Sequence, residues 1–167
     1  KLVREGGLPV YKKDGLPEIE PLANSEILRK ITVGKIIKKD FSRDYINFLK
    51  KFIVLGRPLK IVADVSNGSA GPILEKFLEI SKVQAEKLFF EPDGNFPNHS
   101  PNPFLPKSRK AVEEIVRASG ANLGFILDAD GDRIIFINEK GETIESNHVY
   151  AFLLDNFVKS GEVVLGA

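Results

Sequence analysis

The stretch that decides the fold reads Leu123-Gly124-Phe125-Ile126-Leu127, then Asp128-Ala129-Asp130-Gly131-Asp132-Arg133, then Ile134-Ile135-Phe136-Ile137. Two apolar runs flank a short loop in which aspartates alternate with small residues. Apolar runs of this length, bounded by turn residues, are typical of buried strands. The sequence therefore predicts a strand that enters a tight acidic loop and a second strand that leaves it.

The acidic loop, residues 128–133, predicts a site for a hard divalent cation. Carboxylates this close repel one another unless a cation neutralises them. Oxygen ligands favour Mg²⁺ or Mn²⁺, and three protein carboxylates leave positions open for water or a phosphate oxygen. We therefore expect Asp128, Asp130 and Asp132 to be metal ligands at a site of phosphate chemistry. The alternative is a solvated acidic turn, but such a turn does not need its acids at alternate positions between two buried strands.

Two other loop types have similar spacing. A calcium loop of the EF-hand type fits the three aspartates and Glu139, but it needs glycine where Arg133 stands and helices on both sides. Residues 126–131 also resemble the Asp-x-Asp-Gly motif of haloacid-dehalogenase-like phosphatases. Those enzymes continue with Thr or Val where Asp132 stands, and they need a later acidic pair, whereas no Asp-Asp pair follows Arg133. A phosphatase of this type stays open as an alternative function.

The composition predicts a soluble globular protein. Of its 167 residues, 43% are hydrophobic and 28% charged, with a net charge of +1 and both signs interspersed. A nucleic-acid-binding face would need clustered basic residues, so we expect no nucleic-acid partner. We see no secretory signal and no apolar run of membrane-spanning length. The chain has no cysteine, which excludes disulfides and thiol catalysis and is consistent with the cytoplasm.

The ends of the chain suggest a piece of a longer protein. The sequence contains no methionine, begins with Lys1-Leu2-Val3-Arg4, and stops at residues 163–167 in what reads as the start of a strand. We therefore expect further domains of the same polypeptide.

Periodicity along the chain predicts an α/β fold. Residues 1–55 read as a strand followed by a turn (1–10, with Glu5-Gly6-Gly7 as a turn signal), a short helix (17–30), a short strand (32–39) and a helix (42 to about 52). After Gly56-Arg57-Pro58, strands at 59–65, 86–90 and 123–127 alternate with helices that begin near Pro72 and Pro106. A hairpin (134–144) and a helix (148–159) follow. This order predicts a mostly parallel sheet sandwiched by helices, with an antiparallel edge hairpin and a partial α/β domain before it.

The expected domains are residues 1–55, the remnant of a first domain; residues 56–160, an α/β domain with the acidic loop; and residues 161–167, the start of a third domain.

Two other loops attract interest. The turn Ser66–Gly71 could bind phosphate through backbone N–H groups, but it lacks the lysine and spacing of a P-loop, and we favour a tight turn with close helix packing. The proline-rich loop Asp93–Pro103 is too constrained for a simple connector. We interpret its His99 as a structural hydrogen-bonding partner rather than a catalyst.

Together these stretches resemble the α-D-phosphohexomutases, the phosphomannomutase and phosphoglucomutase group. The acidic loop is similar to their metal loop, usually Asp-Gly-Asp-x-Asp-Arg, with Ala129 where glycine is commoner. Residues 93–103 and 63–71 are similar to two further stretches of their second domain. The order and spacing of all three match, over about residues 59–159.

The resemblance implies a function that this chain carries only in part. Such enzymes have four domains and interconvert sugar 1-phosphates and sugar 6-phosphates of mannose or glucose through a bisphosphate intermediate. The first domain carries a phosphoserine on a loop resembling Thr-x-Ser-His-Asn-Pro, which is absent here, and the third and fourth domains bind the sugar and its phosphate. We therefore expect the fragment alone to be inactive.

The resemblance also implies residue roles. Mg²⁺ held by Asp128, Asp130 and Asp132 would bind a phosphoserine oxygen and spread the transferred charge. Arg133 would be catalytic as a fixed cation beside it, or a structural counter-ion, and the two roles can coexist. Lys1 matches a lysine at the start of the strand after the serine loop and is the second catalytic candidate. A metal-binding or regulatory module with no chemistry of its own stays open as an alternative.

Overall fold

The computed structural model of the protein describes residues 2–11, 15–25 and 34–157. They belong to two compact units, residues 1–39 and residues 40–167, which we describe separately. Lys1, the expected third-domain segment 161–167, and the parts of the expected first helix and second strand that fall in residues 26–33 lie outside the described residues.

The first unit contains a turn and a short helix. The turn signal Glu5-Gly6-Gly7 forms a 3₁₀ turn (η1, Glu5–Gly7) that folds the segment back, so that Val3 and Pro9 form an isolated antiparallel bridge in place of the strand predicted beside the turn. The cause is local: Gly6 and Gly7 adopt positive φ angles of 77° and 74° and reverse the chain. Helix α1 spans Leu16–Ala23, so it begins one residue before the predicted helix 17–30 and ends earlier.

The strand predicted over residues 32–39 is wrong for its described part, residues 34–39, which has no regular structure. Ile36 and Ile37, the apolar residues behind that prediction, are 85% and 77% exposed. A strand needs a neighbour for its backbone groups and its apolar face, and the described residues offer this segment none.

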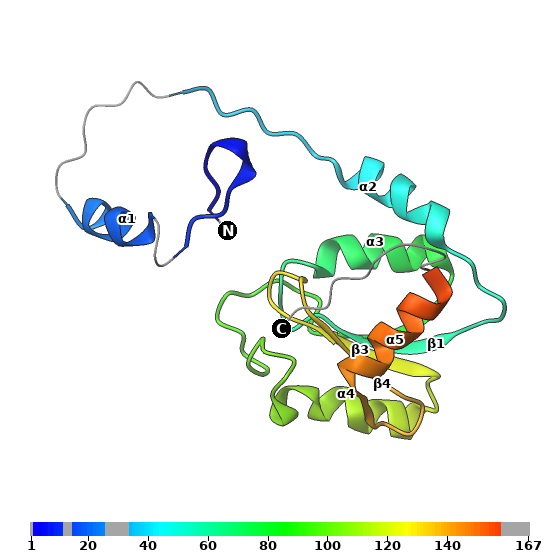
Figure 1. Cartoon of the computed structure of the whole chain (residues 1–167). Helices are drawn as coiled ribbons and strands as arrows, with labels where there is room; N and C mark the ends of the chain where they lie inside the picture. Colours follow the sequence, from blue (N-terminus) through cyan, green and yellow to red (C-terminus); the bar gives the residue numbers. More distant parts are fainter. Residues whose placement is uncertain (1, 12–14, 26–33, 158–167) are drawn as a thin grey trace. The chain divides into compact units, whose positions relative to one another are not determined.

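The second unit is built on a five-stranded sheet in the order β2-β1-β3-β4-β5 (Figure 1). The strands are β1 (Lys60–Asp64), β2 (Gln84–Leu88), β3 (Leu123–Leu127), β4 (Ile134–Ile137) and β5 (Thr143–Ile144). β1 pairs in parallel with β2 and β3, whereas β4 and β5 add an antiparallel hairpin at one edge. The predicted fold class, a mostly parallel sheet with helices and an antiparallel edge hairpin, is confirmed.

Four α-helices accompany this sheet. They are α2 (Ser42–Leu49), extended by the 3₁₀ turn η2 (Lys50–Phe52), α3 (Gly71–Ser81), α4 (Pro106–Ser119) and α5 (Ser146–Phe157). α4 begins at Pro106, as predicted, and Gly120 ends it in the left-handed conformation (φ 64°).

The core lies between the sheet and α4. Its buried side chains are Val62, Val112, Val116, Ala121, Ile126, Ile135 and Ile137. Gly124 lets the helix approach closely, because a Cβ there would lie 2.7 Å from a methyl group of Val112 and 2.7 Å from one of Val116. This packing fixes β3, and with it the start of the acidic loop, in the centre of the sheet.

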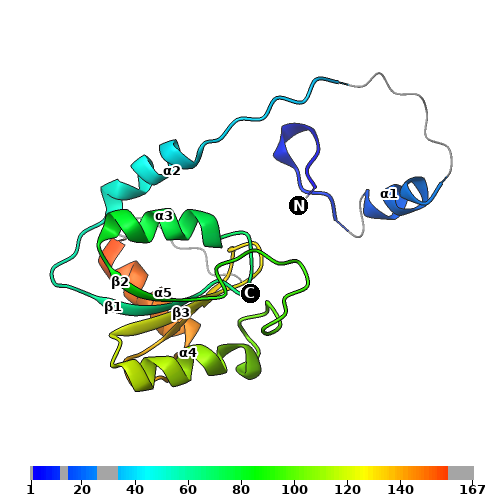
Figure 2. The same cartoon turned by 180° about the vertical axis from the view of Figure 1, so that it is seen from behind.

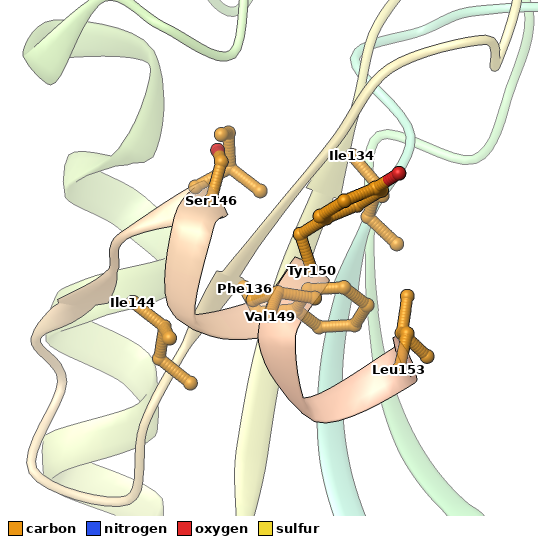
Figure 3. Close-up of a pocket in the computed structure, with 8 residues that line it drawn as sticks. Ile134, Phe136, Ile144, Ser146, Val149, Tyr150 and Leu153 are labelled. Atoms are coloured by element: carbon orange, nitrogen blue, oxygen red, sulfur yellow. The ribbon is translucent and has the colours of Figure 1, made fainter. Parts of the chain in front are cut away.

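The opposite face of the sheet is covered by α3 and α5, as the two views in Figures 1 and 2 show. α5 lies over Phe136 and Ile144 and presents Val149, Tyr150 and Leu153 to them (Figure 3). The cover is incomplete, since apolar clefts of about 150 and 310 Å³ lie along this helix.

Within the described residues, no helix combines the length and the apolar character that a membrane crossing requires.

The compact units do not coincide with the expected domain segments. α2, expected in the first segment, packs against α3 and belongs to the second unit. A natural domain boundary at residue 56 stays a prediction.

Hydrogen exchange tests the domain prediction. We expect the amides of residues 61–63 and 125–127 to exchange far more slowly than those of residues 2–4, because the former sit in the paired, buried centre of the sheet. Exchange followed by mass spectrometry would measure this. Equal protection of both groups in a monomer would contradict an independent α/β domain.

Candidate metal centre

The three aspartates of the acidic loop converge on one point. One carboxylate oxygen from each of Asp128, Asp130 and Asp132 lies within 4.8 Å of the others. Asp128 is fully buried at the end of β3, whereas Asp130 and Asp132 are exposed. Gly131 reverses the chain with a φ of 72°, and its N–H donates to the carbonyl oxygen of Asp128 at 3.2 Å. The sequence predicted this convergence; binding of a metal ion stays a prediction.

Arg133 neutralises the buried member of the cluster. Its Nε donates to Asp128 Oδ2 at 2.6 Å, and its backbone N–H donates to Asp128 Oδ1 at 3.1 Å. The same Nε lies 3.5 Å from Asp132 Oδ1. The hydrogen bond to Asp128, helped by the nearby aspartate charges, raises the pKa of Arg133 above its ordinary value, so the guanidinium is permanently charged. Arg133 is thus a counter-ion to Asp128.

The loop keeps an excess of negative charge that faces solvent. Three carboxylates against one guanidinium give a formal charge of 1 − 3 = −2. Because a divalent cation of oxygen-only coordination would balance this charge, the residues present fit such an ion. The loop runs between strands β3 and β4, so the helix–loop–helix arrangement of an EF-hand is absent here.

The turn Ser66–Gly71 supports the acidic loop through hydrogen bonds and one close backbone contact. Ser66 Oγ donates to Leu127 O at 2.6 Å, directly before Asp128, and the Ser69 N–H donates to Ala129 O at 2.9 Å. Gly68 is required by this contact, because a Cβ there would lie 2.5 Å from Ala129 O.

The same turn has little to offer a phosphate group. The N–H groups of residues 67, 68 and 69 already donate to the carbonyl oxygens of Phe89, Val65 and Ala129. The tight-turn interpretation of the sequence therefore describes this segment better than the phosphate-binding one.

A second buried carboxylate stands at the end of the neighbouring strand. Asp64, at the end of β1, is 0% exposed and lies 3.0 Å from His99 Nε2. This hydrogen bond raises the pKa of His99, while partial burial opposes the shift. The interpretation of His99 as a hydrogen-bonding partner agrees with this geometry.

Sequence reasoning missed Asp64 as the partner of His99. The strand pattern placed Asp64 at a strand end, but His99 lies 35 positions further along the chain, which hid the contact. The available signal was an acidic residue inside an otherwise apolar strand, since a buried carboxylate needs a partner.

Gly68→Ala tests the support of the acidic loop. The new methyl group would meet backbone atoms of Ala129 and Val65 at 2.5–2.9 Å, so the turn or the loop must shift. We expect a loss of about 1–3 kcal/mol in the free energy of unfolding, as for overpacked sites. Urea denaturation measures it, with Gly56→Ala as the control because nothing lies within 4 Å of a Cβ at Gly56. Equal urea midpoints for the two variants would show that the contact is not tight.

Known proteins similar to this chain belong to one group. The family model for phosphoglucomutase/phosphomannomutase, alpha/beta/alpha domain II, matches residues 43–141. A phosphomannomutase of Vibrio cholerae is 34% identical over 95% of this chain and 36% of its own length. Phosphohexose mutases of Xanthomonas campestris are 33% identical over 92% of this chain and 35% of their length.

A solved structure agrees with the sequence comparisons. A phosphoglucomutase/phosphomannomutase family protein of Burkholderia thailandensis superimposes with a TM-score of 0.64 and 34% identity, over 70% of this chain and 26% of that protein. The chain thus spans about a third of the curated relatives' length. Since the family model covers more than half of the chain, the protein belongs to the phosphoglucomutase/phosphomannomutase family, and its second unit contains the family's α/β/α domain II.

Proposed function

We propose that the protein is part of a phosphohexomutase that interconverts the 1-phosphate and 6-phosphate of mannose or glucose, with Mg²⁺ as its cofactor. The family supports the reaction class, and the convergence of Asp128, Asp130 and Asp132 within 4.8 Å carries the assignment of the metal site. The partners we propose are the hexose phosphate, its bisphosphate intermediate and further domains of the same polypeptide.

The metal ligands in this proposal are the three aspartates of the acidic loop. When bound, Mg²⁺ would stabilise the negative charge that moves between oxygens during phosphoryl transfer. Two of the three carboxylates are exposed, so a phosphate group could reach an ion held between them from the solvent side. Asp128 anchors the loop to the sheet from the buried side.

Arg133 has a second role in the proposal. Both recorded side-chain contacts of Arg133 use Nε, and the side chain is 49% exposed. Its terminal amino groups can therefore donate to phosphate oxygens while Nε stays on Asp128. A guanidinium held in this way is a preorganised cation that needs no reorganisation when charge develops.

The phosphoserine donor and the sugar-binding groups are proposed to lie in other domains. Lys1 is proposed as a further catalytic residue only from the family resemblance. The proposal of further domains is supported by the length comparison, because the chain spans about a third of the length of its relatives. We also propose a cytoplasmic location, based on the cysteine-free sequence.

Asp130→Asn tests the metal site. We expect Mn²⁺ affinity, measured by calorimetry on the purified chain, to fall at least about tenfold, since even outer-shell partners of metal ligands contribute that much. The free energy of unfolding without metal should stay the same or rise, because one of three repelling charges is removed. Asp155→Asn, an exposed aspartate on α5, is the control. Unchanged Mn²⁺ affinity of Asp130→Asn would exclude this loop as the site.

The isolated chain should not isomerise sugar phosphates. It lacks a serine-loop motif of the Thr-x-Ser-His-Asn-Pro type, and phosphoryl transfer needs a donor. We expect no conversion of glucose 1-phosphate or mannose 1-phosphate by residues 1–167 in Mg²⁺, followed by a coupled assay. The Vibrio cholerae phosphomannomutase serves as the positive control. Measurable turnover by the chain alone would overturn the proposed division of labour.

A further inference from the structure

We propose that His99 and Asp64 are positioning residues that hold the acidic loop in the shape needed for metal binding. The proposal deepens the proposed function and rests on it for its metal readout. It is carried by a continuous set of contacts from the proline-rich loop 93–103, through the end of β1, to the residue that precedes Asp128.

The first step is the state of His99. Its Nε2 lies 3.0 Å from Asp64 Oδ2, and its Nδ1 lies 2.8 Å from Ser100 O. Both partners can only accept hydrogen bonds, so both contacts are hydrogen bonds only when both ring nitrogens carry a proton. The His99 side chain is 10% exposed, and the edge of its ring packs against Phe89 with 5.2 Å between ring centroids. When both ring nitrogens are protonated, His99 is an imidazolium that neutralises a buried carboxylate.

The second step links Asp64 to the supporting turn. Asp64 Oδ1 accepts from the Ser66 N–H at 2.7 Å, while Oδ2 accepts from His99. Ser66 and Asn67 both adopt left-handed conformations, with φ angles of 53° and 52°. Residues other than glycine hold such conformations only when the surroundings impose them. The Asp64 carboxylate is one of the groups that impose this backbone path.

The third step reaches the acidic loop. Ser66 Oγ donates to Leu127 O at 2.6 Å, and the Ser69 N–H donates to Ala129 O at 2.9 Å. These contacts lie on either side of Asp128 in the sequence. A shift of the turn would therefore move the buried ligand relative to the two exposed ones.

The proline-rich loop is tied to the turn at a second point. Asn98 Nδ2 donates to Asn67 Oδ1 at 2.8 Å, and Asn67 Nδ2 donates to Glu91 O at 2.8 Å. The consecutive loop residues Asn98 and His99 thus contact the turn and the strand residue Asp64 just before it, respectively. This explains why a long loop that contributes no metal ligand is so strongly constrained.

The His99 contact predicts a pH dependence. Asp64, from β1, is the charged group recorded against His99 in the described residues; Phe89 does not titrate, and the contact from its own loop is the Ser100 carbonyl. The pKa of His99 is raised in the folded state from an ordinary value of 6.5. The stability that the protonated His99–Asp64 contact adds to the fold is therefore complete below about pH 6.5. It is lost as the pH rises through the raised pKa of His99 in the folded state.

The test compares His99→Phe, which keeps an aromatic ring and removes both hydrogen bonds, with His99→Gln, which can still donate one. His148→Gln, on α5, is the control, since His148 is exposed and is the other histidine of the chain. The first readout, without metal, is exchange of the Ser69 and Arg133 amide protons by NMR, because these donate to Ala129 O and Asp128 Oδ1. The second readout is Mn²⁺ affinity.

We expect faster exchange of both amides and Mn²⁺ binding weaker by on the order of tenfold in His99→Phe, as for other outer-shell partners. His99→Gln should recover part of both effects, and its difference in urea midpoint from the wild type should shrink between about pH 6 and pH 9. If His99→Phe does not fold, His99→Gln carries the test through its pH profile.

Wild-type exchange at Ser69 and Arg133 in folded His99→Phe, or a pH-independent difference for His99→Gln, would overturn the positioning role. If the wild type itself binds no Mn²⁺, the metal proposal fails, and the amide exchange rates alone then decide the positioning role.

Discussion

Two carboxylates buried at the ends of neighbouring strands are the constraint on which the site depends. Asp64 ends β1, Asp128 follows β3, and both are fully buried. Removing a carboxylate from water costs several kcal/mol unless a partner compensates it. Each has a basic partner: Arg133 for Asp128, and His99, which is cationic when protonated, for Asp64. The two pairs fix the loops that carry these partners, so that the need to satisfy buried charge defines the shape of the whole edge.

The strand order explains why both loops meet there. β1 lies between β2 and β3, so the chain leaves β1 toward one side through α3 and returns to the other side through α4. The helices after β1 and β2 therefore lie on opposite faces of the sheet, whereas the loop after β3 stays at the carboxyl ends of the strands and hydrogen-bonds to the turn after β1. Open α/β sheets bind ligands at such a switch point. The acidic loop, which follows β3, lies at this switch point between β1 and β3.

The sequence predicted this edge well because its signals are local. Each signal is contained in one short stretch of sequence, where periodicity and capping rules apply. This holds for the apolar run of β3, for the alternating aspartates and for the start of α4. The Asp64–His99 contact and the left-handed Ser66 and Asn67 were not predictable in this way, because they depend on segments that only the fold brings together. The strand expected over residues 32–39 failed, in its described part, for a related reason: apolar residues favour a strand only where a neighbouring strand exists to pair with it.

The character of the support for the acidic loop follows from the charge that the loop must keep. Additional lysines or arginines around Asp128 would stabilise the loop without metal, but they would also cancel the charge that attracts a divalent ion. The fold instead holds the loop from the turn Ser66–Gly71 with neutral donors, a serine hydroxyl and a backbone N–H, and with the close approach that Gly68 permits. His99 contacts Asp64 rather than the aspartates of the loop. The geometry of the loop is therefore fixed mainly by groups that leave its excess negative charge in place.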